Sequence, residues 1–415
     1  MTSLIRHLRR LGLPVLAGLV VASLVPLGLA SADQGRSQIG NSNSHASHWV
    51  ATWGASPVDM GNFNYTGTIR NIVFTSVRGD VVRVRFTNTF GDQPLQVDDA
   101  HIGVSGTDGT IQGPNVPVTF SGAQSITIPQ GAEALSDPVR LSVPALADLA
   151  VSVYIPHPSE QTGHLGAQQT TYITYGTDQA GDPSTAGWFP NPSLWFVDSV
   201  DVVATHHVKG TVVALGDSIT DGAASTVNAN TRWPNDLARR LDARHGPTLS
   251  VADEGIGGNQ VLQPGAGVAA LARFDRDVID RAGVKDVILL EGINDIGIND
   301  AQPAALIAGY EQIIAQAHAA GLTIFGGTLT PFKGAGYWSP EKEQTREAVN
   351  NWILTSGAFD GVIDFANATA DPSDPQMLNP AYDSGDHLHP NDAGYQAMAN
   401  AIDLDMLVDQ HQHQD

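Results

Sequence analysis

Cysteine is absent from this chain of 415 residues. The protein therefore forms no disulfide bonds, has no thiolate nucleophile and offers no cysteine ligand to a metal ion. The packing of side chains must stabilise the fold instead. At this length the chain can hold two domains, each with a full hydrophobic core.

Basic residues are scarce as well. Lysine and arginine number 21 against 43 aspartates and glutamates, which gives a formal net charge of −22. A surface this acidic repels phosphate backbones and anionic lipid head groups. We therefore expect no nucleic-acid partner.

Long apolar runs are missing from the chain after residue 32. Before it, three arginines within the first ten residues precede an apolar stretch at 13–30, and Ala32 ends a small-x-small cleavage site. This pattern predicts a secretory signal peptide over residues 1–32, whose removal leaves an extracellular protein without stable membrane insertion. The alternative is an uncleaved anchor, because about 18 apolar residues are borderline for spanning a bilayer. The Ser, Asn and Gly content of residues 33–48 predicts a flexible linker.

Residues 49–205 have the pattern of an all-β domain. Val82, Val84 and Phe86 alternate with polar side chains, and the same period of two recurs further along. Clusters of Gly, Pro, Asn and Asp separate these segments, and no long helical period appears. The pattern predicts an N-terminal β-sandwich domain of jelly-roll-like character.

From residue 206 to residue 415, short apolar segments alternate with helical ones. Leu306, Tyr310, Ile313 and Ala317, for example, share one face of a helix. Strands separated by helices form parallel sheets, so we predict an α/β domain with a flavodoxin-like parallel sheet and helices on both faces. The expected strands cover 211–215, 248–252, 286–290, 323–327 and 362–365.

Four short motifs follow these strands or lie near the C-terminus. Ser218 ends a Gly-Asp-Ser turn after the first strand, Gly258 lies in a glycine-rich turn after the second, and Asn294 follows the third. Asp386 and His389, three residues apart, lie in a late loop before the last helical segment. Open α/β sheets bind their ligands at the carboxyl ends of their strands. The motifs therefore predict one site, built from residues that are far apart in the chain.

Each motif also has an ordinary structural reading. Gly, Asp and Ser are common turn residues, and an Asn such as Asn294 before a helix is a common cap. The glycines near Gly258 are similar to a phosphate-binding turn, although Gln260 stands where the third glycine of Gly-x-Gly-x-x-Gly is required. The presence of all four motifs in this order favours a catalytic site.

In this order the motifs resemble those of the SGNH hydrolase superfamily, also called GDSL esterases and lipases. The resemblance implies that Ser218 is the catalytic nucleophile. It also implies that Gly258 and Asn294 are the glycine and the asparagine of the oxyanion site. Asp386 and His389 match the Asp-x-x-His pair that completes the family's catalytic triad.

These residue types suit acyl transfer chemically. A serine hydroxyl is a weak nucleophile at neutral pH and requires an adjacent general base. Histidine fits that role because its unperturbed pKa lies near ~6.5, and a carboxylate behind the imidazole fixes its tautomer. The oxyanion that forms on attack requires hydrogen-bond donors placed in advance. The backbone N–H groups of Ser218 and Gly258 and the side-chain amide of Asn294 are the candidates.

The resemblance covers residues 211–408, roughly half of the chain. One departure is Asp253, because the family usually has Asn at the start of the second motif. That Asn is not a catalytic group, so the change bears on local hydrogen bonding. The opening Trp-Val-Ala-Thr-Trp-Gly-Ala-Ser-Pro at 49–57 is similar to a secreted bacterial subgroup with an N-terminal β domain.

Other histidines were weighed as base or metal ligand. His387 competes with His389 as the base, and the three-residue spacing from Asp386 favours His389. The remaining histidines lack an acidic partner at metalloprotease spacing. We therefore expect no metal ion and no cofactor.

The sequence thus predicts a secreted carboxylic-ester hydrolase that acts through an acyl-Ser218 intermediate on a small-molecule or glycan ester. Short acyl chains and acetylated glycans are the expected substrates. Two other functions remain open, a carbohydrate-binding protein with an inactive hydrolase domain and an acyltransferase that uses the same acyl-enzyme. Turnover of p-nitrophenyl acetate would distinguish a hydrolase from an inactive carbohydrate-binding protein. Product analysis with a competing alcohol acceptor would distinguish a hydrolase from an acyltransferase.

Overall fold

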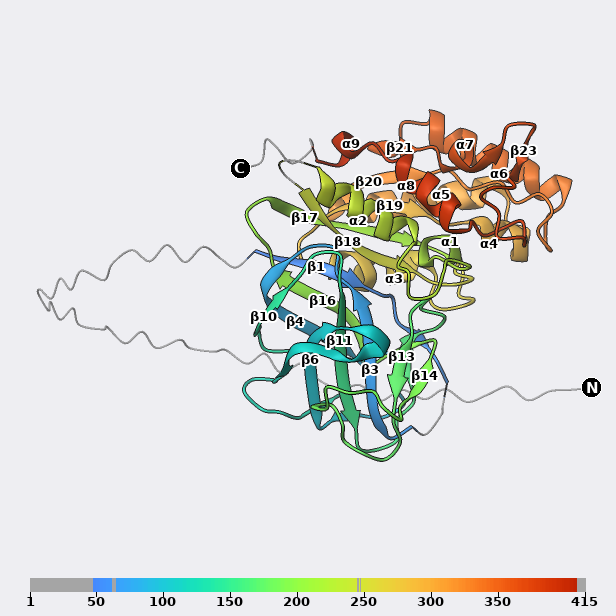
Figure 1. Cartoon of the computed structure of the whole chain (residues 1–415). Helices are drawn as coiled ribbons and strands as arrows, with labels where there is room; N and C mark the ends of the chain where they lie inside the picture. The colour runs from blue at the N-terminus through green and yellow to red at the C-terminus, as the bar shows by residue number, and fades with distance from the viewer. Residues whose placement is uncertain (1–47, 62–64, 245, 247, 409–415) are drawn as a thin grey trace, which may run out of the picture. The chain divides into compact units, whose positions relative to one another are not determined.

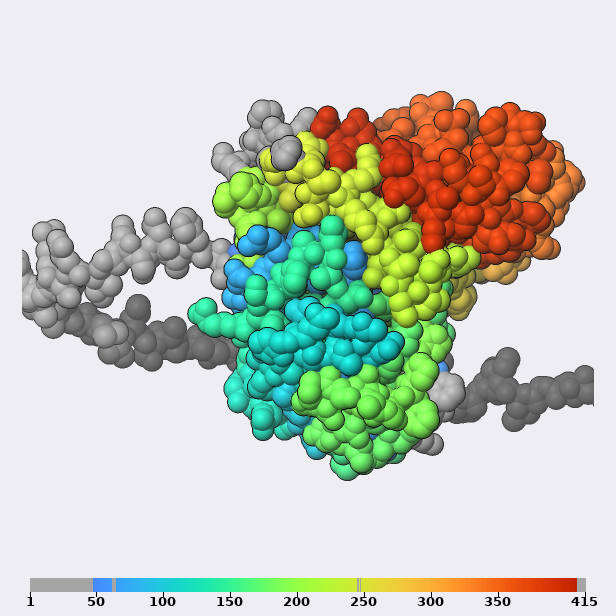
Figure 2. Space-filling view, in the orientation of Figure 1, coloured from blue at the N-terminus to red at the C-terminus, as the bar shows by residue number. Residues whose placement is uncertain are grey.

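The computed structural model describes residues 48–61, 65–244, 246 and 248–408 (Figure 1). The predicted signal peptide and the predicted linker up to residue 47 lie outside these residues. The described strands and helices form a β region, residues 49–203, and an α/β region, residues 208–408. Both belong to one compact unit, and their atoms meet without a visible gap (Figure 2). No described helix is long and apolar enough to cross a membrane.

Two antiparallel sheets make up most of the β region. The larger has the strand order β14-β13-β3-β11-β6-β7, and the smaller has the order β1-β16-β4-β10 with β9 paired to β4. The strands of the larger sheet are β3 (Gly67–Phe74), β6 (Asp99–Ser105), β7 (Ile111–Pro117), β11 (Asp148–Ile155), β13 (Thr171–Ile173) and β14 (Phe189–Asn191). Those of the smaller sheet are β1 (Trp49–Gly54), β4 (Gly79–Thr87), β9 (Glu133–Leu135), β10 (Val139–Val143) and β16 (Val197–Val203).

Alternate side chains from both sheets fill one core. Val84 and Phe86 of β4 and Leu149 and Val151 of β11 belong to it, and all four are fully buried. Two sheets that share a core in this way form a sandwich, so the predicted β-sandwich is confirmed. Short strands complete the region, namely β2 (Val58–Asp59), β12 (Thr162–His164) and β15 (Leu194–Trp195) in one small sheet, and the pair β5 (Leu95–Val97) and β8 (Ile126–Ile128).

A five-stranded parallel sheet with the order β18-β17-β19-β20-β21 is the centre of the α/β region. Counted along the chain this order is 2-1-3-4-5, which is the flavodoxin order. The strands are β17 (Val208–Gly216), β18 (Thr248–Gly255), β19 (Val284–Leu290), β20 (Thr323–Gly327) and β21 (Gly361–Ile363). The last strand ends before residue 365 because the side chain of Asp364 accepts a hydrogen bond from Asn367 N–H and caps a helix.

Helices cover both faces of this sheet, as predicted (Figure 1). One group packs α2 (Trp233–Ala243), α7 (Phe365–Thr369) and α8 (Asp392–Asn400) together, and another packs α3 (Ala270–Phe274), α5 (Pro303–Ala319) and α6 (Pro340–Thr355). On α5, the predicted face of Leu306, Tyr310, Ile313 and Ala317 is buried. The shorter elements are α1 (Ser218–Asp221), the π-helical turn Asp275–Ile279, α4 (Ile293–Asn299), α9 (Leu404–Val408) and the strand pair β22 (Ala370–Asp371) and β23 (Asp374–Leu378).

Candidate active site

Helix α1 places Ser218 at the carboxyl end of strand β17. The strand is buried and ends at Gly216, and Asp217 then caps the helix by accepting a hydrogen bond from Ile219 N–H at 2.9 Å. A side chain at Gly216 would not fit, because its Cβ would lie 2.2 Å from the hydroxyl oxygen of Thr220. Ser218 is therefore the first residue of a helix in a sharp strand-to-helix turn.

Three of the predicted residues form one hydrogen-bonded chain. His389 Nε2 lies 2.8 Å from Ser218 Oγ, and His389 Nδ1 lies 2.6 Å from Asp386 Oδ2. A carboxylate only accepts hydrogen bonds, so His389 Nδ1 carries the proton and Nε2 accepts from the Ser218 hydroxyl. A serine, a histidine and an aspartate linked in this order can activate the hydroxyl as a nucleophile.

Asp386 is held by backbone groups as well as by the imidazole. Its Oδ1 accepts from Leu388 N–H at 2.9 Å and from His389 N–H at 2.8 Å. Partial burial favours the neutral carboxyl, but the hydrogen bonds from His389 and Leu388 outweigh it and lower the pKa of Asp386 to about 2. The carboxylate is therefore ionised at neutral pH, as an orienting partner of the imidazole must be.

His387 is turned toward other partners. Its Nδ1 lies 2.6 Å from Asp383 Oδ2, and its backbone N–H donates to Oδ1 of the same carboxylate at 3.0 Å. The ring packs against Gly334, and the backbone of His387 has a left-handed φ of 62°. The structure thus brings His389, and not His387, to the hydroxyl of Ser218.

Gly258 lies in a tight turn that follows strand β18. Its φ of 76° is in the left-handed region that favours glycine, and a Cβ there would lie 3.0 Å from the Cβ of Ala266. The turn is closed by a hydrogen bond from Asn259 N–H to Ile256 O at 3.0 Å. Ile256 N–H in turn donates to Gly216 O at 3.0 Å, which ties the turn to the end of β17 beside the nucleophile.

Asn294 reaches the same turn from helix α4. Its Nδ2 donates to the carbonyl of Asn259 at 3.0 Å, and its Oδ1 accepts from the hydroxyl of Tyr337 at 3.4 Å. The amide nitrogen carries two hydrogens, so the second is available to an oxyanion. The next residue, Asp295, fixes the chain after the turn by accepting from Val261 N–H at 2.8 Å. Asn294 is therefore held beside Gly258 by its hydrogen bond to Asn259, the next residue in the turn.

Some residues that hold this site were not predicted from the sequence. Asp217 has a recognisable signal, because Asp is a preferred N-cap residue. Arg273 has no such signal, although its guanidinium donates to the carbonyls of Gly216 and Glu254 and to Asn259 Oδ1. These partners are distant in the chain, and no local pattern predicts that they meet.

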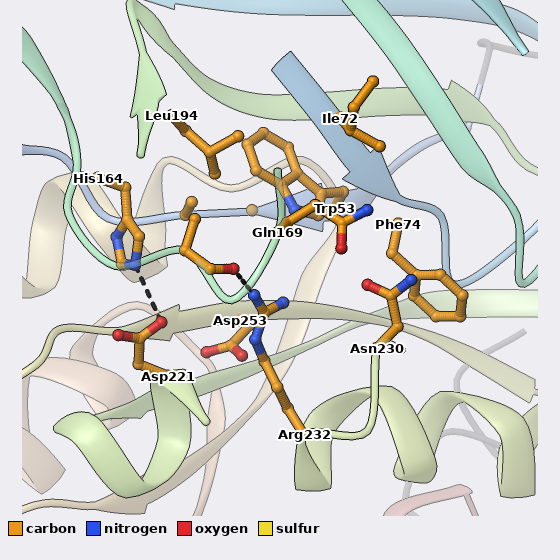
Figure 3. Close-up of a pocket in the computed structure, with 13 residues that line it drawn as sticks. Trp53, Ile72, Phe74, His164, Gln169, Leu194, Asp221, Asn230, Arg232 and Asp253 are labelled. Carbon is orange, nitrogen blue, oxygen red and sulfur yellow. Dashed lines mark hydrogen bonds and ion pairs between the residues drawn. The ribbon is translucent and has the colours of Figure 1, made fainter. Parts of the chain in front are cut away.

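A small cavity lies beside helix α1, between the β region and the α/β region (Figure 3). Its volume is about 20 Å³, which is room for about one water molecule and too little for an ester substrate. Trp53 and Phe74 form part of its apolar wall, and His164, Asp221 and Arg232 supply polar groups. The cavity therefore belongs to the interface between the two regions.

Metal ligands are not clustered in the part of the chain that the structure describes. Within it, no group of three or more His, Asp or Glu side chains is placed to hold a metal ion.

Part of the chain is similar to a known protein family. Residues 214–397 match the model of the GDSL-like Lipase/Acylhydrolase family, and no curated protein matches the chain. Among solved structures, a GDSL-like lipase from Bacteroides thetaiotaomicron is 20% identical, with 48% of this chain and 88% of that chain covered and a TM-score of 0.37. An aryl esterase from M. smegmatis is 14% identical, with 46% of this chain and 95% of that chain covered and a TM-score of 0.38. An acetylxylan esterase from Geobacillus stearothermophilus is 20% identical, with 47% of this chain and 92% of that chain covered and a TM-score of 0.36.

The family match and the site coincide in the chain. Residues 214–397 contain all five predicted site residues, which are Ser218, Gly258, Asn294, Asp386 and His389. Residues 214–397 are therefore a domain of the GDSL-like lipase/acylhydrolase family, the SGNH group of carboxylic ester hydrolases.

Proposed function

We propose that the protein is a secreted serine esterase in which Ser218 attacks the ester carbonyl and carries the acyl group. One observation carries this proposal, namely the hydrogen-bonded chain from Asp386 through His389 to Ser218, with links of 2.6 and 2.8 Å. A general base within hydrogen-bond reach of a hydroxyl, itself oriented by a carboxylate, is the arrangement that nucleophilic catalysis by serine requires.

The reaction has two steps. In the first, Ser218 Oγ bonds to the carbonyl carbon while its proton passes to His389 Nε2. The tetrahedral intermediate then expels the alcohol, which takes that proton from His389, and acyl-Ser218 remains. In the second step a water molecule gives its proton to His389 and attacks the acyl carbon. The acid then leaves, and Ser218 recovers the proton.

The oxyanion of both intermediates requires donors that are already in place. The N–H of Ser218 lies at the start of helix α1, where the first N–H groups of a helix have no partner within it. We assign the other two donors to Gly258 N–H and Asn294 Nδ2. This assignment is supported by the hydrogen bond from Asn294 Nδ2 to the Asn259 carbonyl at 3.0 Å, which holds Asn294 against the turn that contains Gly258.

The substrate is a short-chain acyl ester, with acetylated glycans included. The triad lies near the surface, since 50% of the Asp386 side chain and 18% of the His389 side chain are exposed. An open, hydrated site suits a small acyl group on a well-solvated alcohol or sugar. The net charge of −22 also favours neutral over anionic substrates.

Secretion is the second part of the proposal. It rests on the basic start, the apolar stretch at 13–30 and the cleavage motif that ends at Ala32. Exported protein is expected to begin at Asp33, which N-terminal mass spectrometry checks after expression in a bacterial host. Retention of Met1 in the membrane fraction would contradict secretion.

The esterase activity is tested with p-nitrophenyl esters of increasing chain length and with a serine-directed fluorophosphonate. Ser218→Ala should lower turnover by about 10⁴-fold or more and abolish labelling. Ser225→Ala is the matched control, since Ser225 is buried near the same helix and has no role in the proposed chemistry. Equal activity in the Ser218→Ala and wild-type proteins would refute the proposal. Product analysis with added alcohol then separates hydrolysis from acyl transfer.

A further inference from the structure

One residue of the β region, Ser56, contacts two of the elements that build the active site. It follows strand β1 in the Trp-Gly-Ala-Ser-Pro segment and is fully buried. Its hydroxyl donates to Glu254 Oε2 at 2.7 Å and accepts from Arg273 Nη1 at 2.8 Å. Gly54, two residues earlier, allows this approach, because a Cβ there would lie 2.2 Å from Glu254 Oε1.

Arg273 extends this contact to the oxyanion turn. Its Nε donates to Asn259 Oδ1 at 3.0 Å, and its other nitrogens donate to Glu254 O at 2.8 Å and to Gly216 O at 3.0 Å. Asn259 is the residue whose carbonyl holds Asn294. The side chain is fully buried, so its guanidinium has no access to water as a replacement partner. Arg273 therefore fixes the ends of β17 and β18 and the turn that carries Gly258.

A second contact from the β region reaches the helix of the nucleophile. His164 Nε2 lies 3.0 Å from Asp221 Oδ1 (Figure 3). His164 Nδ1 lies 2.9 Å from Ser56 O. Asp221 is the last residue of α1, the helix that begins with Ser218. A carbonyl and an ionised carboxylate both only accept, so both ring nitrogens of His164 donate and the imidazole is cationic. Burial and Arg232 oppose this charge, but Asp221 outweighs them and raises the pKa of His164.

A neighbouring contact supports the same helix boundary. The guanidinium of Arg232 donates to the carbonyl of Ala167, three residues after His164 in the β region (Figure 3). Arg232 also packs against Gly222, the residue that follows α1, because a Cβ on Gly222 would lie 2.2 Å from Cγ of Arg232. The segment 164–167 therefore contacts both the end of α1 and the chain that leaves it.

From these contacts we infer that Ser56 and His164 are positioning residues of the esterase, through which the β region holds the catalytic groups in place. Ser56 holds the oxyanion turn through Arg273, and His164 holds the helix of Ser218 through Asp221. The inference rests on the proposed esterase function. A misplacement of a catalytic group by about 1 Å can lower turnover by about 10²-fold.

The first test compares two buried serines of the β region. Ser56→Ala removes the contact to Arg273. Ser76→Ala is its matched control, because Ser76 Oγ accepts from Val251 N–H at 3.0 Å in the middle of β18, four residues before the end of the strand that Arg273 holds. Both variants should unfold at a lower temperature than wild type. Only Ser56→Ala should lower kcat, by about 10- to 100-fold, with a much smaller change in KM.

The second test compares two histidines of the β region. His164→Gln breaks the ionic contact with Asp221 and should lower kcat about 10-fold or more. His101→Gln is the control, since His101 pairs with Asp99 at 3.4 Å within the β region. Fluorophosphonate labelling of Ser218 should slow in His164→Gln and in Ser56→Ala in proportion to kcat, which a purely structural role would not produce in folded protein.

The outcomes separate the two proposals. Ser56→Ala and His164→Gln test separate contacts. If one of these variants does not fold at 25 °C, the kcat of the other still tests the inference. Wild-type kcat in folded Ser56→Ala or in folded His164→Gln would overturn the inference while the esterase function stands. Equal losses of kcat in Ser56→Ala and Ser76→Ala would also overturn it. A wild-type protein without ester turnover or labelling would overturn the esterase function and this inference with it.

Discussion

Asp386 binds His389 twice, with Oδ2 at 2.6 Å from the ring Nδ1 and Oδ1 at 2.8 Å from the backbone N–H. A spacing of three residues lets one carboxylate reach both groups of the same residue. The hydrogen bonds to Asp386 that orient the imidazole therefore lie within a four-residue segment. The fold brings this segment to Ser218, with His389 Nε2 at 2.8 Å from its hydroxyl oxygen.

Asp386→Asn should lower kcat on the order of 10³- to 10⁴-fold with little change in thermal stability. The amide can donate to the imidazole and favour the wrong tautomer, which leaves no acceptor for the Ser218 proton. Steady-state kinetics with p-nitrophenyl acetate measure the effect. A variant with more than about one tenth of wild-type kcat would show that Asp386 does not orient His389.

His389→Ala should cost about as much activity as Ser218→Ala, because members of a triad act as a unit. His387→Ala is the matched control, since His387 pairs with Asp383 at 2.6 Å and makes no hydrogen bond to Ser218. It should retain most of the wild-type kcat. An inactive His387→Ala beside an active His389→Ala would reverse the assignment of the base.

Asn294→Ala should lower kcat by roughly 10²- to 10³-fold, the usual effect of removing one oxyanion donor. KM should change less, because the lost hydrogen bond matters most in the transition state. Tyr337→Phe provides a comparison, since it removes only the 3.4 Å contact to Asn294 Oδ1 and should have a milder effect. An effect of Asn294→Ala confined to KM would assign Asn294 to substrate binding.

Asp253→Asn, which installs the residue usual in the family, should stabilise the protein at alkaline pH. Oδ2 of Asp253 is buried without a partner, and burial raises the pKa of this carboxyl to about 7. In the unfolded chain the pKa is near ~3.9, so between pH ~4 and ~7 the folded state keeps a proton that the unfolded state has lost. The free energy of unfolding therefore falls as pH rises through this window, and asparagine abolishes that loss.

The expected gain of Asp253→Asn is close to zero at pH 4 and on the order of 1–4 kcal/mol at pH 8. Thermal and urea unfolding at several pH values measure it. Asp242→Asn on helix α2 is the control, because Asp242 is exposed and its substitution should not change the pH profile. A gain for Asp253→Asn that does not vary with pH would contradict the burial argument.

Much of the fold could be read from the sequence because it depends on local patterns. The β-branched run before Ser218 is a buried strand, and the period of 3.6 residues at Leu306 and Tyr310 marks a buried helix face. The strand predicted at 323–327 matches β20 residue for residue. Where the prediction erred, at the end of β21, a local cap by Asp364 that was not recognised ends the strand early.

The side chains that could do the chemistry were recognisable from local spacing alone, since Asp386 and His389 are three residues apart and Ser218 lies two residues after the end of a strand. How the β region meets this site could not be predicted from the chain. Ser56 and Glu254 are 198 residues apart, and no periodicity or turn signal links them. Their contact arises because two separately patterned regions pack together and bury Arg273, whose hydrogen bonds must then be satisfied inside the protein. Local patterns specify elements, but such long-range polar contacts exist only once the elements are packed.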